Sequence, residues 1–532
     1  MRPNLPTFLL LGTILSLTGC TPEPQAERPN VLLISIDTLR ADHLSCYGYE
    51  RATSPNIDAL ADEGFLFERA LSTSSWTLPA HLSLFTGLPV SAHGVCDDRL
   101  WTRHDSAGQP ISAPLRGRFL SDELNEAGYR NAGFYSWKYL DEQFGFGSGF
   151  EDWERFGHSL FSHPVTGREF ERLRAANDID ALKALAAAHP ELPTEDGVPC
   201  SDKVVDRALA WLDGVEESDD FFLFVHLFDV HDPYVPPEPF DRKFDADYQG
   251  PIDGRRVTTA DSSIRGDMPA ADLQHLIALY DGGISWVDSQ VGRLIEGLRA
   301  KGLDENTLII LTSDHGEEFF EHGHKTHRRQ LFLESIQVPL IIRWPAKYTQ
   351  PKRIPGTVGI VDVAATIYAA AGIETNVPTA GEDLIELAQR ETPRGTRTYL
   401  SEMQLFAGSA VPERQLALAK DDDFAFLQAT GGAAWHIREF DLSTDPRGAQ
   451  VGSVVTTDAD SRRPWRSELD RMRRFVSQLR DAQPTLAGAL PALDEHDKKQ
   501  LAALGYAGLE DADFGEGDEN RLCLDGCVWP NE

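Results

Sequence analysis

The sequence predicts an α/β protein: a mostly parallel sheet sandwiched by helices, followed by a small antiparallel sheet with one helix. Near-continuous apolar runs at 30–36, 221–225 and 307–313 are typical of strands that are covered on both faces. An amphipathic pattern at 271–300 predicts a long helix before the third strand, and such alternation gives a parallel sheet. Beyond residue 372, short strand-like segments follow one another without helices between them, which indicates the antiparallel sheet.

Cap and turn residues delimit the other elements. Ser54 is expected to cap a helix that ends at Gly64, with Pro55 as its first residue, and Gly87 is expected to end a helix that begins near Thr77. Residues 236–270 lack apolar periodicity, which predicts a long loop bordering the site. Further helices are predicted at 117–127, 166–188, 202–211 and 464–481, and further strands at 131–137, 338–343, 397–402, 416–420, 424–428 and 435–440.

The two ends of the chain differ from the rest. Residues 1–20 carry an apolar stretch too short to span a bilayer comfortably, and they end in Leu17-Thr18-Gly19-Cys20, the pattern of a bacterial lipobox. Cys20 is therefore expected to carry the lipid of an exported lipoprotein that is anchored to a membrane, facing the periplasm or the cell surface. A plain signal peptide or a short anchor is the alternative. Next come a Pro-rich tether (21–29), a catalytic domain (30–390), a C-terminal subdomain (391–508) and an acidic tail (509–532).

The net charge limits the classes of partner that the protein can bind, and the spacing of two cysteines suggests a local link. The formal net charge of −34 over 532 residues argues against nucleic acid and against an anionic membrane surface, because both need a basic footprint. An acidic chain can still bind an anionic substrate where a metal ion and local basic groups set the sign of the pocket. Cys523 and Cys527 are spaced for a small disulfide loop, with a metal site as the alternative.

Residues that can hold a metal ion follow the predicted strands. Asp37 follows the first apolar run, Asp314 and His315 follow the run at 307–313, and His231 lies just beyond the run at 221–225. In open α/β sheets, ligand sites form beyond the carboxyl ends of the strands. Thr77 lies at a predicted helix N-terminus, where free N–H groups favour an anion, although a threonine there can also be only a cap. The convergence of these residues predicts a metal-dependent site.

The motifs resemble those of the sulfatase family of the alkaline-phosphatase superfamily, and their order and spacing hold from about residue 29 to residue 372. They are Ile34-Ser35-Ile36-Asp37-Thr38-Leu39-Arg40-Ala41-Asp42, Ser54-Pro55-Asn56-Ile57-Asp58, Thr77-x-Pro79, Leu84-Phe85-Thr86-Gly87, Phe228-Asp229-Val230-His231-Asp232-Pro233-Tyr234, Thr312-Ser313-Asp314-His315-Gly316-Glu317-Glu318 and Val338-Pro339-Leu340-Ile341-Ile342-Arg343-Trp344-Pro345. The resemblance implies an alkaline-phosphatase-like fold and one divalent metal ion, Ca, Mg, Mn or Zn, held by Asp37, Asp314 and His315. It also implies that the Thr77 hydroxyl faces this metal as the nucleophile.

Two departures from the family pattern bear on the chemistry. Thr38 stands where many members have a second aspartate that binds the metal. Thr77 stands where the family has a Cys or Ser that is oxidised to formylglycine. His81 stands where the family has an Arg. Oxidation of a threonine side chain would give a ketone, so no formylglycine is expected. Thr is the nucleophile in related phosphodiesterases and phospho-group transferases of the superfamily.

The remaining site residues are assigned by position. His231 resembles a family histidine that contacts the substrate or protonates the leaving group, although a histidine of an ordinary loop is an equal reading. His81 is expected to steady the nucleophile in place of the Arg. His81, Lys138, His324 and Lys325 are expected to contact an anionic substrate.

The sequence therefore predicts a metal-dependent hydrolase of sulfate or phosphate esters, with phosphoesters preferred on chemical grounds. A glycan or a lipid is the expected carrier of the ester. A transferase of phospho-headgroups onto lipid or glycan is the nearest alternative. A true sulfuric ester hydrolase and an inactive surface-binding lipoprotein are the others.

Overall fold

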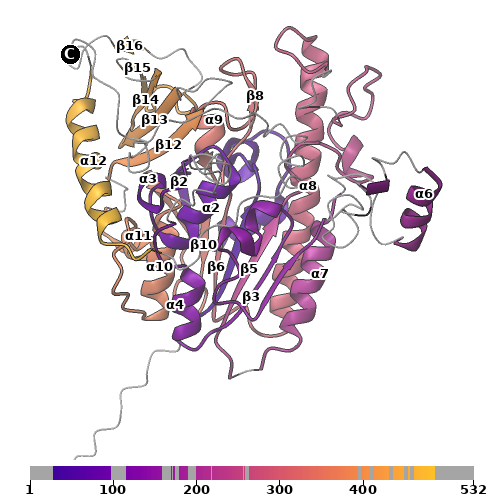
Figure 1. Ribbon diagram of the computed structural model, residues 1–532, viewed down its shortest axis with the longest axis horizontal. Coiled ribbons are helices and arrows are strands. Elements are labelled where there is room, and N and C mark those ends of the chain that lie inside the picture. The colour runs from indigo at the N-terminus through magenta and orange to yellow at the C-terminus, as the bar shows by residue number, and fades with distance from the viewer. Residues whose placement is uncertain are drawn as a thin grey trace, which may run out of the picture.

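The computed structural model describes residues 28–96, 115–157, 169, 172–173, 179–189, 199–216, 218–255, 257, 263–392, 397–405, 413–430, 435–448, 453–455 and 461–485. A large sheet runs through the middle of the molecule with helices on both faces, and a smaller sheet lies beside one end of it (Figure 1). The predicted fold class is confirmed: a mostly parallel sheet with helices and a small antiparallel C-terminal sheet.

Nine strands of the described residues form the large sheet, in the order β11-β2-β10-β6-β1-β5-β3-β4, with β9 paired to β2. The central strands β6, β1, β5 and β3 run parallel, whereas β10 is antiparallel to both of its neighbours. Their bounds are β1 (Asn30–Ile36), β2 (Phe65–Leu71), β3 (Arg130–Tyr135), β4 (Asp152–Arg155), β5 (Phe221–Leu227), β6 (Thr307–Thr312), β9 (Gln337–Val338), β10 (Leu340–Arg343) and β11 (Lys352–Gly359).

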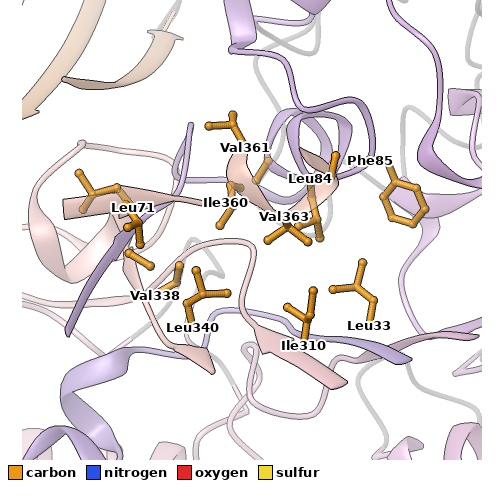
Figure 2. Close-up of a cluster of buried hydrophobic side chains, with 14 of the residues drawn as sticks. Leu33, Leu71, Leu84, Phe85, Ile310, Val338, Leu340, Ile360, Val361 and Val363 are labelled. Atoms are coloured by element: carbon orange, nitrogen blue, oxygen red, sulfur yellow. The ribbon is translucent and has the colours of Figure 1, made fainter. Parts of the chain in front are cut away.

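Alternate side chains of the central strands enter two separate cores. Leu33 and Ile310 lie in the core under one layer of helices, where Leu84 and Phe85 of α2 pack above them (Figure 2). Leu32 and its neighbours lie in the core under the other layer. The first layer contains α2 (Thr77–Thr86), α4 (Leu120–Glu126), α10 (Asp362–Ala371) and α11 (Leu384–Gln389); the second contains α1 (Pro55–Asp62), α7 (Ser201–Leu212) and α8 (Ala270–Ala300).

The C-terminal unit is an antiparallel sheet in the order β12-β13-β14-β15-β16, and α12 packs along it (Figure 1). Trp435, Trp465, Leu469 and Val476 are fully buried between the sheet and the helix. The bounds are β12 (Tyr399–Leu405), β13 (Glu413–Lys420), β14 (Asp423–Thr430), β15 (His436–Asp441), β16 (Ser453–Val455) and α12 (Trp465–Asp481). Shorter elements of the described chain include α3 (Val90–His93), α6 (Ile179–Ala188), α9 (Leu333–Ile336) and the hairpin of β7 (Glu318–Phe319) with β8 (Lys325–Thr326), besides several short 3-10 helices.

The element boundaries mostly fall within a few residues of those predicted, with three informative differences. The sequence analysis did not identify β2, β4 or β11, which lie near the edges of the large sheet. Ser54 donates to the Asp58 carboxylate rather than capping α1, and Asp288 of α8 accepts from the N–H groups of Asn56 and Ile57 instead. The helix expected at 166–188 is described only as α6 and isolated residues before it.

Several predictions lie outside the described residues: the segment 1–20 with Cys20, most of the tether, the acidic tail, and the pairing of Cys523 with Cys527. Cys96 is disulfide-bonded, while Cys46 and Cys200 are free thiols. Across the described part of the chain, no helix is both long and apolar enough to cross a membrane.

Candidate active site

The register of the central strands brings the predicted metal ligands together. Ser35 of β1 is paired with Thr312 of β6 on one side and with His226 of β5 on the other. Asp37 and Asp314, each two residues beyond these paired positions, therefore leave the same edge of the sheet. All of these side chains are fully buried.

Thr77 is the first residue of α2 and follows Trp76, whose backbone is extended. Every residue of α2 is buried, because the helix packs into the core above the sheet. Pro79 fits at the third position, where its missing N–H has no partner to lose. Gly87 ends the helix with φ 65°, in the left-handed region that glycine tolerates. The predicted placement of the Thr77 hydroxyl at a helix N-terminus is therefore what the structure shows.

Asp37, Asp314 and His315 each offer a ligand atom, and these atoms lie within 4.8 Å of one another. His315 Nε2 is 3.3 Å from Asp314 Oδ2 and 3.8 Å from Asp37 Oδ1. The Thr77 hydroxyl lies 3.5 Å from the same nitrogen. His315 Nδ1 donates to the Gly316 carbonyl oxygen at 2.9 Å, which leaves Nε2 with its lone pair directed at this cluster.

The donor set fits a divalent cation. Both carboxylate oxygens of Asp37 and Oδ2 of Asp314 are buried without a hydrogen bond. Buried carboxylate oxygens are rarely left unpaired, and a cation is the usual partner when they are. Burial raises the pKa of Asp37, and burial together with the charge of Asp37 raises that of Asp314 to about 6. Burial lowers the pKa of His315 to about 3, which keeps its imidazole neutral and able to bind a metal.

His81 lies one turn after Thr77 on α2 and is completely buried. Its Nδ1 donates to the Thr77 carbonyl oxygen at 2.9 Å, its Nε2 accepts from the Ser35 hydroxyl at 3.0 Å, and Nδ1 is 3.6 Å from Asp314 Oδ2. Burial lowers the pKa of His81 to about 3. A neutral, enclosed imidazole can orient Thr77 and Asp314 but offers no charge to a substrate, so His81 is a positioning residue.

A second group of potential ligands lies beside the first. His231, Asp232 and His327 each offer a ligand atom within 4.8 Å of the others, and all three are buried. The ring of His327 is 4.6 Å from that of His315 and 4.7 Å from that of His231. Burial lowers the pKa of His231, but Asp232, Asp37 and Glu317 raise it more. The predicted site residue His231 therefore lies next to the group formed by Asp37, Asp314 and His315.

The other predicted substrate contacts are more scattered. Lys138 is buried in the turn that follows β3, and this turn packs against α2. Lys325 Nζ donates to the carbonyl oxygen of Ile264 at 2.8 Å, with Asp232 among the charges that act on it. His324 is exposed, and Glu413 and Arg329 are the charges that act on it. His327, three residues further along the same loop, is the histidine that reaches the site.

Supporting contacts hold the loops that carry these residues. Arg40 is 5% exposed and forms ion pairs with Asp42 and Glu321. It also donates to the Glu317 carbonyl oxygen at 2.9 Å, which ties the loop after β1 to the loop after β6. Asp229 accepts from the N–H groups of Cys200 and Ser201 and therefore caps α7 rather than serving the site.

Two residues at the site, His226 and His327, were not predicted from the sequence. His226 Nε2 is 3.3 Å from Asp37 Oδ2, and neither ring nitrogen of His226 has a hydrogen bond. The available signal was a polar residue directly after the apolar run 221–225. A histidine in a buried strand needs a partner, so His226 could have been suspected. His327 carried no such signal, because it lies in a polar loop with several other histidines.

Comparison with known proteins assigns the family. The sulfatase family model matches residues 29–373, and a model described as N-sulphoglucosamine sulphohydrolase, C-terminal, matches residues 320–451. An uncharacterized sulfatase YidJ of Escherichia coli is 28% identical over 398 residues, covering 71% of this chain and 74% of that protein. An arylsulfatase of Clostridium perfringens is 23% identical and covers 84% and 94% of the two chains.

Solved structures agree on the fold. A protein determined in complex with its substrate D-glucosamine-2-N,6-O-disulfate superposes with a TM-score of 0.64 at 18% identity, covering 87% of this chain and 100% of the other. The phosphonate monoester hydrolase of Agrobacterium radiobacter has a TM-score of 0.59 at 22% identity, covering 86% and 97%. Because the sulfatase family model spans more than half of this chain, the protein belongs to the sulfatase family and is an ester hydrolase of the alkaline-phosphatase superfamily.

Proposed function

We propose that this protein hydrolyses phosphate esters through a Thr77 nucleophile. The observation that carries the proposal is the position of the Thr77 hydroxyl at the N-terminus of α2, 3.5 Å from His315 Nε2 and beside the Asp37–Asp314–His315 cluster. A divalent cation held there would neutralise charge on the ester oxygens and favour the ionised hydroxyl. The His81 ring donates a hydrogen bond to the carbonyl oxygen of Thr77 and so holds the backbone of Thr77 in place.

The proposed reaction takes place in two displacements. The bond from Thr77 Oγ to phosphorus forms as the ester bond breaks, and the hydroxyl proton of Thr77 leaves with the alcohol product. Water then attacks phosphorus, the bond to Thr77 breaks, and the threonine hydroxyl is restored as inorganic phosphate departs.

The identity of the nucleophile favours phosphorus over sulfur. Threonine cannot become the aldehyde hydrate whose elimination releases sulfate, so a sulfated Thr77 would have to be cleaved by attack at sulfur. A phosphorylated threonine is easier to cleave, because water can attack phosphorus in line with the threonine oxygen. The fold is shared with a phosphonate monoester hydrolase at 22% identity, so it accommodates phospho-substrates in at least one similar protein.

The substrate class that we propose is an anionic ester on a glycan or lipid. One protein of similar fold was solved with its substrate D-glucosamine-2-N,6-O-disulfate, and a relative from Bacteroides thetaiotaomicron is an N-acetylglucosamine-6-O-sulfatase. The alternatives are transfer of a phospho-headgroup to lipid or glycan and true sulfatase activity.

A turnover panel separates these functions. Aryl sulfate, phosphate monoester, phosphate diester and phosphonate monoester should be offered to the purified chain with Zn, Mn, Mg and Ca in turn. We expect phosphate esters or diesters to be turned over fastest. Faster cleavage of the aryl sulfate would overturn the proposal, and product formation only in the presence of a lipid or glycan acceptor would identify a transferase.

We also propose that the protein is exported and anchored by acyl chains on Cys20, because Leu17-Thr18-Gly19-Cys20 closes an apolar stretch and precedes a polar, Pro-rich segment. Cys20→Ala should leave the signal segment uncleaved and the protein without acyl chains. Mass spectrometry of the membrane-extracted protein is the measurement, and an unmodified mature N-terminus downstream of Cys20 in the wild type would contradict the proposal.

A further inference from the structure

We propose that Arg329 binds a second anionic group of the substrate, a role that rests on the ester hydrolysis proposed above. The preferred ester then lies on a carrier that bears another phosphate, sulfate or carboxylate. Arg329 is exposed and follows the β7–β8 hairpin, two residues after the buried His327. A guanidinium presents two parallel N–H donors, which match two oxygens of such a group.

The loop that carries Arg329 has the opposite charge to the chain as a whole. The segment His324-Lys325-Thr326-His327-Arg328-Arg329 contains three lysine or arginine side chains and no carboxylate, whereas the formal net charge of the chain is −34. The charge of Arg329 acts on His324 and on Lys325, which were both expected to contact an anionic substrate. A local basic segment on an acidic protein directs an anion to that one place.

Contacts of this loop place it beside the proposed nucleophile. The His327 ring lies 4.6 Å from the His315 ring. Arg328 donates its N–H to the carbonyl oxygen of Ser75, two residues before Thr77, at 2.9 Å. The loop is therefore fixed at the buried site and reaches the solvent at its next residue.

Arg329 is held in position, but no carboxylate neutralises it. Gln415 of β13 donates to the Arg329 carbonyl oxygen at 3.0 Å. Glu318 is the acid whose charge acts on this arginine, and its carboxylate already accepts from Gln330 at 3.0 Å and from Ser335 at 3.1 Å. Arg329 forms no ion pair with any residue that the structure describes. Its guanidinium is therefore available to an anion of the substrate.

The alternative is that Arg329 only stabilises the C-terminal sheet. Glu413 of β13 would be a suitable partner, but its carboxylate accepts from Gln415 at 2.7 Å. Arginines that support the fold look different here: Arg40 and Arg343 are both 5% exposed, and each pairs with two carboxylates. Arg329 has neither property, which favours binding of a ligand over a role in folding.

Paired sugar esters test the inference. The purified full-length chain should be given a sugar monophosphate and the bisphosphate of the same sugar, and kcat/KM should be measured for each. We expect the wild type to favour the bisphosphate roughly tenfold, because one charge-assisted contact contributes about that factor. Arg329→Gln should bring the two values close together. Arg329→Lys should keep part of the preference, since the charge remains while the paired donors are lost.

Arg474→Gln is the matched control. Arg474 is also exposed and without an ion pair among the described residues, but it lies on α12, away from β8 (Figure 1). This variant should keep the wild-type preference, and circular dichroism should show that all variants are folded.

The outcome is separable from that of the proposed phosphoesterase activity. If the turnover panel favours sulfate esters, a monosulfated and a disulfated sugar replace the two phosphates, and the same preference is expected. Similar kcat/KM values for the two esters in the wild type would overturn the inference. A preference that is unchanged in Arg329→Gln would overturn it as well, even where phosphate esters are cleaved as proposed.

Discussion

At the residue scale, the proposed nucleophile is Thr77. If the proposal is right, Thr77→Ala removes the attacking oxygen, so we expect the turnover rate of the best ester to fall on the order of a thousandfold or more, equivalent to at least about 4 kcal/mol of transition-state stabilisation. Thr77→Ser keeps a hydroxyl at the same helix position and should remain within about tenfold of the wild type. Steady-state kinetics on the preferred substrate gives both values.

Metal content is the control for the Thr77 variants. The ligands Asp37, Asp314 and His315 are untouched, so Thr77→Ser should bind as much metal as the wild type. If Thr77→Ala keeps the wild-type rate while its metal content is normal, another group is the nucleophile.

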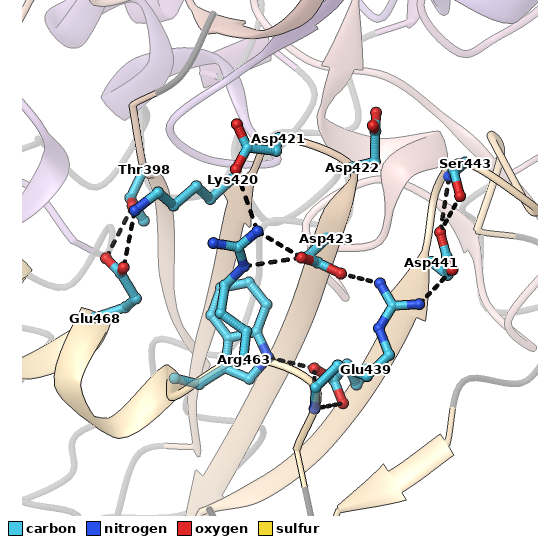
Figure 3. Close-up of polar contacts among 12 residues, drawn as sticks. Thr398, Lys420, Asp421, Asp422, Asp423, Glu439, Asp441, Ser443, Arg463 and Glu468 are labelled. Carbon is cyan, nitrogen blue, oxygen red and sulfur yellow. Dashed lines mark hydrogen bonds and ion pairs between the residues drawn. The ribbon is translucent and has the colours of Figure 1, made fainter.

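At the element scale, α12 is held on the C-terminal sheet by ion pairs that depend on pH (Figure 3). Burial would raise the pKa of Glu468, but hydrogen bonds from Arg471, Lys420 and Thr398 lower it to about 2. Because the folded-state pKa lies below the unfolded value near 4.5, Glu468 stabilises the fold above pH 4.5 and loses this effect as pH falls toward 2. Glu468→Gln should cost about 1 kcal/mol at pH 7, since partial exposure weakens the pairs.

Urea unfolding of wild type and Glu468→Gln between pH 7 and pH 3 measures this effect. The difference between the two proteins should shrink as the pH falls below 4.5. Glu386→Gln serves as the control, because Glu386 is 73% exposed and pairs only loosely with Arg390, at 3.5 Å. A difference for Glu468→Gln that is constant with pH would show that its charge does not hold the helix.

Elements also show how far the sequence could predict this molecule. The apolar runs of β1, β5 and β6 predicted the central strands of the sheet. They also predicted that Asp37, Asp314 and His315 lie together at one edge of it. The edge strand β11 and its neighbour β2 were not predicted, because β2 interrupts its apolar run with Glu68 and Arg69 and β11 begins with exposed Lys352 and Arg353. His327 could not be predicted from periodicity either. Its loop depends on left-handed conformations at Thr326 and Arg328, with φ 63° at both, which tertiary contacts impose.

At the scale of the whole molecule, the C-terminal sheet supports the loop that leads to Thr77, the proposed nucleophile. Glu402 of β12 is fully buried, its N–H donates to the Thr73 carbonyl oxygen at 2.8 Å, and its own carbonyl oxygen accepts from Ser74 at 3.0 Å. Its carboxylate accepts from the N–H of Ser91 at 3.0 Å and from the Ser91 hydroxyl. The two sheets are therefore expected to unfold as one unit, with the site lost at the same point.

Glu402→Ala tests this coupling. It leaves the buried Ser91 N–H without its carboxylate, so we expect a loss of about 2 to 4 kcal/mol in the free energy of unfolding. Urea melts followed by circular dichroism and by residual esterase activity should both shift by the same amount and remain coincident, because β12 and the Thr77 loop share the contacts that are lost. Ser443→Ala, at an exposed position after β15, should leave both curves in place. Activity that survives at urea concentrations where the circular dichroism signal has already dropped in a separate step would show that the C-terminal sheet unfolds on its own.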